Sequence, residues 1–243
     1  MWDDLCTKQC FIASDGSAPH EKGSFAWVLS TDDGVRIARC CGPVFGKAIT
    51  SYRAESYGIL SFLRFYLHMI TVYLKQNIPV KPPHLVCNNL SLVKTITKLH
   101  TYENIFPNTT MEAEWDCIAQ ILQTLNALED KSPTFDHIKG HQDNHTPYEE
   151  LTLLAQLNCD ADSYASSFLR DHPNLSHKIA CQFPAGECSL HFQDGTITRD
   201  MKQACAEARN LPALKRYICE RSQWWTEDIF NLVDWSAHGQ ALR

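Results

Sequence analysis

Four side chains that carry oxygen atoms lie on different expected strands and helices, at strand ends or within a helix. Asp15 closes an apolar strand, Glu55 lies in the first turn of a helix, and Asn88 ends the next strand. Asp162 lies in the last helix before Pro173. Mg²⁺ prefers oxygen ligands, and two such cations about 3.5–4 Å apart can clamp the attacking and leaving oxygens of a phosphodiester. These residues could therefore support phosphodiester hydrolysis, provided that the fold brings them to one point.

The elements expected to position these residues are short strands and longer helices. The strands expected from alternating or continuous apolar residues are Phe11–Ala13, Ser24–Ser30, Val35–Cys41, His84–Cys87 and Phe135–Lys139. The helices expected from apolar residues at helical spacing are Tyr52–Leu74, Ser91–Leu99, Met111–Leu128, and one that starts near Asn158 within Leu151–Leu169. Three strands followed by strand–helix alternation predict a mixed five-stranded sheet flanked by helices, in the α/β class.

The sequence changes character after Pro173. Asp194-Gly195 lies between apolar alternations, so Cys188–Thr198 is expected to form a hairpin. Further helices are expected from Thr198 through Asn210, over Leu211–Ser222, and after Thr226, where two acidic residues favour a helix N-terminus. We therefore expect two domains: residues 1–170, and a small, mainly helical unit of hairpin plus helices over residues 171–243. The tryptophans of this unit, including Trp224, are expected to pack in its core.

The net charge of −6 does not favour nucleic-acid binding, because contacts to phosphates need lysine and arginine. Part of this acidity would belong to the carboxylates of a metal site, whose mutual repulsion is relieved by bound cations. Any nucleic-acid surface must then be local. Arg53, Lys94, Lys98 and His100 could line a phosphate track, and Lys94 and Lys98 share one helix face. A solvated helix face explains the same residues equally well.

The cysteines and the apolar segments indicate a cellular compartment. The cysteine count of eleven is odd, and no C-x-x-C pair occurs. A signal peptide has a basic start and an apolar middle, whereas this N-terminus is acidic and polar. The longest apolar run, Ile59–Leu74, is interrupted by Arg64 and His68. We therefore expect an intracellular protein of the cytoplasm or nucleus, with reduced thiols, no membrane association and a monomeric state.

Five blocks of residues occur in a fixed order over about two thirds of the chain. They are Ser14-Asp15-Gly16-Ser17; Tyr52-Arg53-Ala54-Glu55; Cys87-Asn88-Asn89 followed by Leu90-Ser91-Leu92-Val93; His137-Ile138-Lys139-Gly140-His141-Gln142-Asp143; and Leu157-Asn158-Cys159-Asp160-Ala161-Asp162 with Ala165. In this order they resemble the ribonuclease H domain of retrotransposon (reverse transcriptase) polyproteins. Ile229-Phe230-Asn231-Leu232-Val233-Asp234-Trp235 is similar to segments that follow such domains in algal or fungal retroelements.

The resemblance implies a ribonuclease H-like fold and a metal-dependent endonuclease that hydrolyses the RNA strand of RNA/DNA hybrids. It implies two Mg²⁺ ions, for which Mn²⁺ could substitute. The implied partners are the hybrid and the reverse transcriptase region of the same polyprotein. By resemblance, the metal-binding positions are Asp15, Glu55, Asn88 and Asp162, and the nucleic-acid-binding positions are Ser17, Arg53, Asn89 and Lys94.

His141 and Asp162 match further features of the family pattern. His141 corresponds to a mobile histidine that assists proton transfer or product release, and an unperturbed histidine, with a pKa near ~6.5, suits that role. Asp162 is preferred over Asp160 because the spacing from Asn158 through Asp162 to Ala165 fits the pattern. On the same helix, at about 100° per residue, Asp160 would point about 160° away from Asp162.

Asn88 departs from the family pattern, which has aspartate at this position. Asparagine offers a cation only a neutral carbonyl oxygen, so one metal is expected to bind more weakly. The alternative function is therefore a catalytically impaired relic or domesticated module that holds hybrid without cutting it. A proofreading-type exonuclease on the same fold would need an Asp-x-Glu on the first strand, where this chain has Asp15-Gly16-Ser17.

Overall fold

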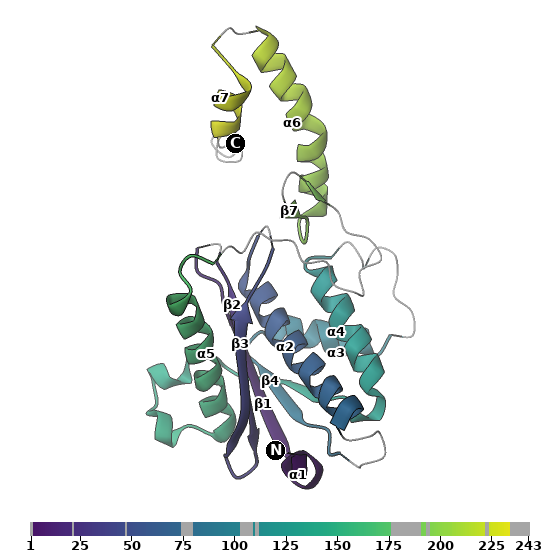
Figure 1. Ribbon diagram of the computed structural model, residues 1–243, viewed down its shortest axis with the longest axis vertical. Coiled ribbons are helices and arrows are strands. Elements are labelled where there is room, and N and C mark those ends of the chain that lie inside the picture. Colours follow the sequence, from purple (N-terminus) through teal and green to yellow (C-terminus); the bar gives the residue numbers. More distant parts are fainter. Residues whose placement is uncertain are drawn as a thin grey trace. The chain divides into compact units, whose positions relative to one another are not determined.

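The chain divides into two compact units, Met1–Arg199 and Asp200–Arg243 (Figure 1). The computed structural model describes residues 2–20, 22–46, 48–73, 80–102, 109, 112–175, 191–192, 195–221 and 224–233. Each unit is described by itself below. The domain boundary that the sequence predicts after residue 170 stays a prediction.

A five-stranded sheet forms the centre of the first unit. Its strands are β1 (Cys10–Ser17), β2 (Ser24–Thr31), β3 (Arg36–Pro43), β4 (His84–Cys87) and β5 (Thr134–His137). They lie in the order β3-β2-β1-β4-β5. The β1–β2 and β2–β3 pairs are antiparallel, whereas β1–β4 and β4–β5 are parallel. The mixed five-stranded sheet predicted from the sequence is therefore confirmed.

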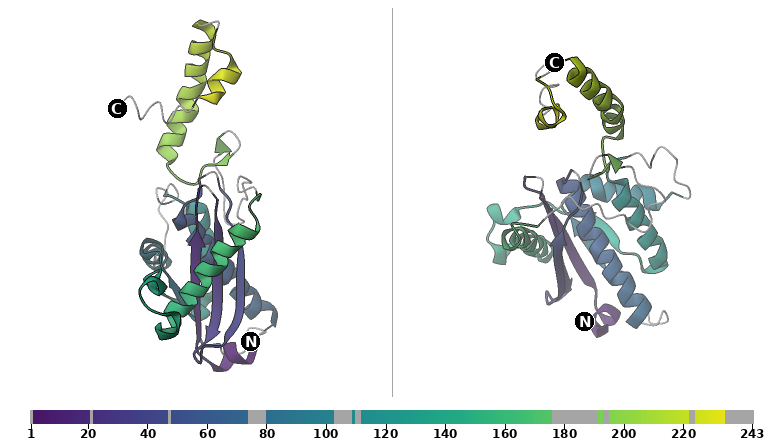
Figure 2. Two further views of the ribbon diagram at one scale, coloured as in Figure 1. Left: turned by 90° about the vertical axis from the view of Figure 1, so that its left-hand side faces the viewer. Right: turned by 45° about the horizontal axis from the view of Figure 1, so that its top comes forward.

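Helices cover both faces of this sheet. The helices of this unit are α1 (Trp2–Thr7), α2 (Ser51–His68), α3 (Leu90–His100), α4 (Trp115–Leu128) and α5 (Leu153–Asp171). Helix α5 crosses one face alone, and α2, α3 and α4 lie on the other side (Figures 1 and 2). This sheet, with its strand order and its helices, has the ribonuclease H-like fold predicted from the sequence.

The two faces of the sheet have cores of different size, which follow from the alternation of side chains along each strand. The larger core packs under α2, α3 and α4 and includes Ile12, Leu29, Phe62, Leu85 and Ile121. The smaller core packs under α5 and consists of Ala13, Val28, Val86, Leu157 and Ala161. Small side chains on α5 therefore bring this helix close to the strands.

Two glycines let the backbone of α2 contact β1. A Cβ atom at Gly16 would lie 2.4 Å from the backbone nitrogen of Glu55, and one at Gly58 would lie 2.3 Å from Ser14 Oγ. Real Cβ atoms do not approach other atoms so closely, so a larger residue at Gly16 would push the helix from the strand. The Asp15-Gly16 pair thus holds Glu55 beside the end of β1.

Several helix boundaries differ from the sequence-based predictions. Helix α5 begins at Leu153, five residues before the predicted start, because the side chain of Thr152 accepts a hydrogen bond from Ala155 N and caps the helix. Helix α4 begins at Trp115, and the predicted start at Met111 lies outside the described residues. Helix α2 begins at Ser51, so Glu55 lies just beyond the first turn rather than within it.

The predicted hairpin is present where the structure describes it. Strands β6 (His191–Phe192) and β7 (Gly195–Thr196) pair in the antiparallel direction, whereas the beginning of the predicted segment at Cys188 lies outside the described residues. The hairpin belongs to the first compact unit. Within the described ranges, none of the helices combines the length and the apolar character that crossing a bilayer requires.

The described residues of the second unit, 200–221 and 224–233, form one long helix and one short helix. Helix α6 (Met201–Arg221) is continuous, although two helices meeting at Asn210 were predicted. Pro212 removes one hydrogen-bond donor, but it lies between Leu211 and Ala213, which have high helix propensity. Helix α7 (Glu227–Leu232) begins at the predicted Thr226, whose side chain accepts from Ile229 N. Trp224, predicted to be a core residue, is 86% exposed, so that prediction was wrong for this residue.

Candidate active site

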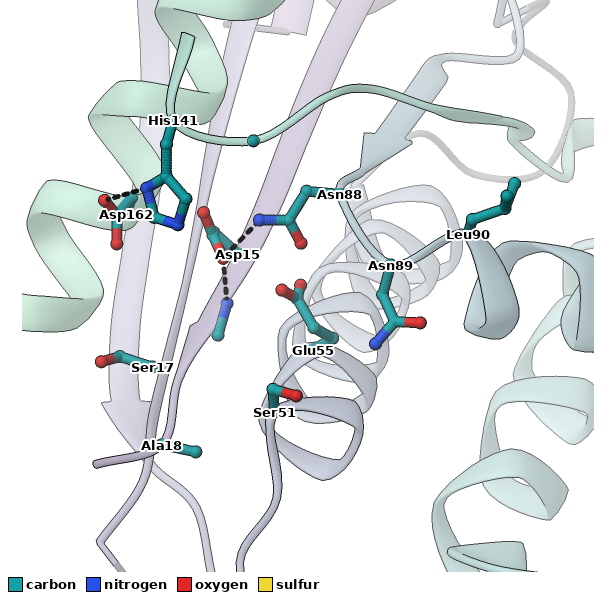
Figure 3. Close-up of a pocket in the computed structure, with 12 residues that line it drawn as sticks. Asp15, Ser17, Ala18, Ser51, Glu55, Asn88, Asn89, Leu90, His141 and Asp162 are labelled. Atoms are coloured by element: carbon teal, nitrogen blue, oxygen red, sulfur yellow. Dashed lines mark hydrogen bonds and ion pairs between the residues drawn. The ribbon is translucent and has the colours of Figure 1, made fainter. Parts of the chain in front are cut away.

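The predicted catalytic and metal-binding residues line one pocket in the first unit (Figure 3). They come from the end of β1, from α2, from the turn after β4, from the loop after β5 and from α5. The lining residues are Asp15, Gly16, Ser17, Ala18, Ser51, Glu55, Asn88, Asn89, Leu90, Gly140, His141 and Asp162. The structure therefore brings together side chains that are up to about 150 residues apart in the sequence.

Asp15 is held by hydrogen bonds to both of its carboxylate oxygens and is only 4% exposed. Oδ1 accepts from the backbone N–H of Gly16 at 2.7 Å and from Asn88 Nδ2 at 3.2 Å. Oδ2 accepts from Asn158 Nδ2 at 3.2 Å, in a buried contact with α5. Two amide groups, one on each side, thus fix the orientation of this carboxylate.

Glu55 lies beside Asp15 and is 3% exposed. Cys87 Sγ donates to Glu55 Oε2 at 3.5 Å. Burial raises the pKa of Glu55 well above its ordinary value, and the negative charge of Asp15 raises it further. Burial also raises the pKa of Asp15. We call Asp15, Glu55 and Asn158 the buried side of the pocket.

Asp162 and His141 form the open side of the pocket. His141 Nδ1 lies 3.6 Å from Asp162 Oδ2, and their side chains are 65% and 40% exposed. His141 has a φ of 52°, in the left-handed region. The preceding Gly140 passes close to Asn88, since a Cβ atom at Gly140 would lie 3.0 Å from Asn88 Nδ2. The loop after β5 therefore places His141 at the rim of the pocket (Figure 3).

Asp160 lies away from this pocket. Its carboxylate accepts from Arg36 Nε at 3.0 Å and from Tyr148 Oη at 2.7 Å. Asp162, two residues later on the same helix, lines the pocket instead. The prediction that these two aspartates point in different directions is confirmed.

Arg53 is buried and ion-paired, which excludes the predicted contact with nucleic acid. It is 2% exposed, and its guanidinium forms ion pairs with Glu114 at 2.7 Å and Asp116 at 2.9 Å. Its Nε also donates to the carbonyl of Phe45 at 2.6 Å. The backbone N–H of Glu114 in turn donates to the carbonyl of Thr198 at 2.6 Å. With these partners Arg53 joins α2 to the start of α4, and the prediction for this residue was wrong.

The other predicted nucleic-acid contacts differ in their surroundings. Lys94 is exposed on α3, as are Lys98 and His100. Ser17 and Asn89 line the pocket, and the Asn89 side chain also accepts from Leu92 N at 3.1 Å, which caps α3. The contact of these residues with nucleic acid stays a prediction.

Sequence reasoning missed two residues that act on the carboxylates. Asn158 donates to Asp15, and Cys87 donates to Glu55. Asn158 lies four residues before Asp162, so both are on one face of α5 and both reach the same site. That spacing was a signal that could have identified Asn158 as a site residue. No comparable signal distinguishes Cys87 from the other cysteines of the chain.

The donor set fits a divalent cation on the buried side better than on the open side. Asp15 and Glu55 are adjacent, desolvated carboxyl groups whose repulsion a cation would relieve. Asn88, by contrast, directs its N–H donor rather than its oxygen toward Asp15. Among the described residues, no three His, Cys, Asp or Glu side chains are arranged to hold one ion together. The residues as placed thus fit one cation at Asp15 and Glu55, and the expectation of two ions stays a prediction.

Comparisons with known proteins give similarity at the level of fold. No protein-family model and no curated protein matches the sequence. The solved RNase H1 of the halophilic archaeon Halobacterium salinarum NRC-1 is 14% identical, with a TM-score of 0.44 over 67% of this chain and 98% of that one. The RNase H domain of PFV is 17% identical, with a TM-score of 0.48 over 66% and 93%.

A third solved structure, LC11-RNase H1 in complex with RNA/DNA hybrid, is 13% identical, with a TM-score of 0.44 over 65% of this chain and 95% of that one. Each of the three similarities covers about two thirds of this chain. The strand order and the placement of α2 and α5 carry the fold assignment independently of these values. The first unit has the ribonuclease H-like fold, and it brings Asp15, Glu55 and Asp162 to one pocket.

Proposed function

We propose that this protein is a metal-dependent ribonuclease H that cleaves the RNA strand of RNA/DNA hybrids, with a metal site weakened at Asn88. The observation that carries the proposal is the convergence of Asp15, Glu55, Asp162 and His141 from four separate elements on one pocket. The resemblance of the five sequence blocks supports the same substrate. It also supports a place in a retroelement polyprotein, beside its reverse transcriptase region.

The protein groups have separable tasks in this proposal. Asp15 and Glu55 hold a divalent cation, which when bound would stabilise charge on the oxygens of the reacting phosphodiester. Asn158 and Cys87 orient these two carboxylates by donating hydrogen bonds to them. On the open side, Asp162 orients the imidazole of His141 through Nδ1. His141 Nε2 is then the atom that gives a proton to the leaving oxygen.

Asn88 weakens this site in two ways. It contributes no negative charge, and hard cations favour charged oxygens. Its amide also donates to Asp15 Oδ1 and so engages an oxygen that the cation would use. Loss of a partner that merely orients a metal ligand costs about 10–100-fold in affinity or activity, and loss of a direct ligand costs at least as much. We therefore expect the parent protein to need Mn²⁺ or a high concentration of Mg²⁺.

The hydrogen bond from Asn88 to Asp15 also favours a second candidate function. Asn88 Nδ2 donates to Asp15 Oδ1 at 3.2 Å and so stabilises part of the carboxylate's negative charge without a metal ion. The domain would then hold RNA/DNA hybrid as a binding module and not cut it. This candidate predicts metal-independent binding, because the phosphate and 2′-hydroxyl contacts of a hybrid do not require the cation.

The replacement Asn88→Asp distinguishes the two candidates. Cleavage of a labelled RNA/DNA hybrid is measured for the parent and the variant in Mg²⁺ and in Mn²⁺. The enzyme proposal expects the variant to exceed the parent by about tenfold or more in Mg²⁺, and Asp15→Asn added to the variant abolishes the gain. A folded variant that does not cleave hybrid in either metal, but binds hybrid more tightly than DNA duplex, supports the binding-module candidate. If the parent already equals the variant, Asn88 is not a metal ligand.

A further inference from the structure

Helix α6 is a basic segment in an acidic protein. It contains Lys202, Arg209, Lys215, Arg216 and Arg221 against the two acidic residues Glu207 and Glu220. The helix thus carries a formal charge of +3 in a chain whose net charge is −6, which leaves −9 for the other residues. Because nucleic-acid binding needs local positive charge, α6 is where the second unit could supply it.

Three of these cations form a stripe along one face of α6. Lys202, Arg209 and Arg216 are seven residues apart, which places them within about 40° of one another around the helix and about 10.5 Å apart along it. All three side chains are exposed, and none makes an ion pair with a described residue. The residues between them on the same face are Cys205, Ala206, Pro212 and Ala213, all of them exposed. We call Lys202, Arg209 and Arg216 the cationic stripe.

The cationic stripe lies opposite the face that packs within the second unit. The half-buried residues of the helix, among them Ala204, Leu211 and Ile218, cluster about 180° from Arg209. Lys215 lies on that half-buried side, where it pairs with Glu227 of α7 at 3.1 Å. Packing of α6 against α7 therefore leaves the stripe accessible. The acidic Glu220 falls on the exposed face only at its C-terminal end.

We propose that the cationic stripe binds the sugar-phosphate backbone of a nucleic-acid duplex, as a second contact apart from the active-site pocket. Three cations spread over about 21 Å suit a row of phosphates, and the small side chains between them allow the backbone to approach the helix. A membrane surface fits less well, because binding there needs large apolar side chains beside the cations. Between the cations, this face of α6 carries only alanine, cysteine and proline. Such contacts carry no sequence information and should not distinguish RNA from DNA.

The test compares two double variants of the full chain that remove the same charge from the same helix. Arg209→Gln with Arg216→Gln removes two cations of the stripe, and Lys215→Gln with Arg221→Gln removes two cations outside it. Binding of a labelled 20-base-pair RNA/DNA hybrid and of the matching DNA duplex is measured by fluorescence anisotropy at several salt concentrations. EDTA is present throughout, so that cleavage does not interfere. Circular dichroism checks that both variants keep their helices.

The stripe variant should bind both duplexes about tenfold more weakly than the parent at 50 mM salt. Its plot of log affinity against log salt should be shallower by about two units, and the control variant should change much less. Arg209→Lys with Arg216→Lys should bind both duplexes as tightly as the parent, because it keeps the two positive charges that contact the phosphates. Binding to anionic phosphatidylserine vesicles is measured in parallel. Equal affinities of the stripe variant and the control for the duplexes, or a loss of binding by the stripe variant confined to the vesicles, would overturn the proposal.

The same titrations separate this inference from the proposed function. Preference of the parent for hybrid over DNA duplex reports on the ribonuclease H pocket, whereas the stripe affects both duplexes by one factor. A parent without hybrid preference but with the stripe effect supports the inference and removes the proposed function. A parent that prefers hybrid but shows no effect of the stripe variant supports the proposed function and removes the inference.

Discussion

The buried and open sides of the pocket hold their carboxylates by different means. Asp15 and Glu55 are 4% and 3% exposed and are fixed by amide and thiol donors. Asp162 has a side chain 40% exposed, lies 3.6 Å from His141 and accepts a hydrogen bond from Ser166 at 3.5 Å. The buried side is therefore built into the contact between β1, α2 and α5, whereas the open side can adjust when a substrate arrives. Substitutions should reveal this difference as large effects on one side and small effects on the other.

The largest effect is expected from Gly16→Ala. The new Cβ would lie 2.4 Å from the backbone of Glu55, so α2 must move from β1 or the strand must distort. We expect a loss of about 3 kcal/mol or more in the free energy of unfolding, measured by urea denaturation. Gly140→Ala on the open side is the matched control. Its Cβ would lie 3.0 Å from Asn88 Nδ2 and at ordinary contact distance, 3.5 and 3.6 Å, from Cβ and Cγ of the same side chain, and should cost under about 1 kcal/mol.

An intermediate effect is expected from Asn158→Ala. The change removes a buried donor to Asp15 Oδ2 and leaves that carboxylate oxygen without its partner on α5. Such a loss costs about 1–3 kcal/mol, again measured by denaturation. Cys159→Ala, at the next position on α5, controls for the change in helix propensity. If both variants lose the same stability, the clamp on Asp15 does not stabilise the fold.

A smaller, opposite effect is expected from Glu55→Gln in metal-free protein. Because the folded-state pKa of Glu55 is raised, its stabilising contribution is present below the unfolded pKa of about 4.3 and is lost as the pH rises through the folded pKa. Glutamine cannot ionise, so the variant should melt a few degrees above the parent at pH 8 and no higher near pH 4. Melting curves with EDTA, recorded from pH 4 to pH 8, test this expectation, and a variant that melts no higher than the parent at pH 8 would contradict it.

The smallest effect on stability is expected from His141→Ala. The side chain is 65% exposed and makes one long ion-pair contact, so its removal should change the free energy of unfolding by less than about 0.5 kcal/mol. In the Asn88→Asp background, the same change should lower hybrid cleavage by about 100-fold, because a group that transfers a proton is lost. An unchanged cleavage rate would leave His141 without a chemical task.

The sequence predicts those parts of the fold and site that depend on local patterns. Asp15 and Asn88 follow recognisable strands, and the helical repeat separates Asp162 from Asp160. These features need no knowledge of distant contacts. The order of strands along the chain, together with the order of the five blocks, was enough to predict the mixed sheet and the acidic pocket.

Contacts between distant residues explain what the sequence did not predict. Arg53 looked like a surface cation because its partners, Glu114 and Asp116, lie about sixty residues away and pair with it only in the folded chain. The start of α5 was placed too late because the cap at Thr152 was not recognised ahead of the apolar pattern. Two helices were predicted on either side of the Asn210–Leu211 junction, whereas α6 continues through it although Pro212 removes one helical hydrogen bond.

The hydrogen bond from Glu114 to Thr198 bears on how the domain can be isolated. A chain cut after residue 170 would retain every element of the sheet and α5 but would lose the Thr198 carbonyl. The N–H at the start of α4 would then be unpaired, next to the carboxylate that pairs with Arg53. Such a fragment should be more sensitive to proteases near Glu114 than one that ends after Arg199. For expression and crystallisation, the useful unit is therefore the chain through Arg199, with the hairpin strands β6 and β7 included.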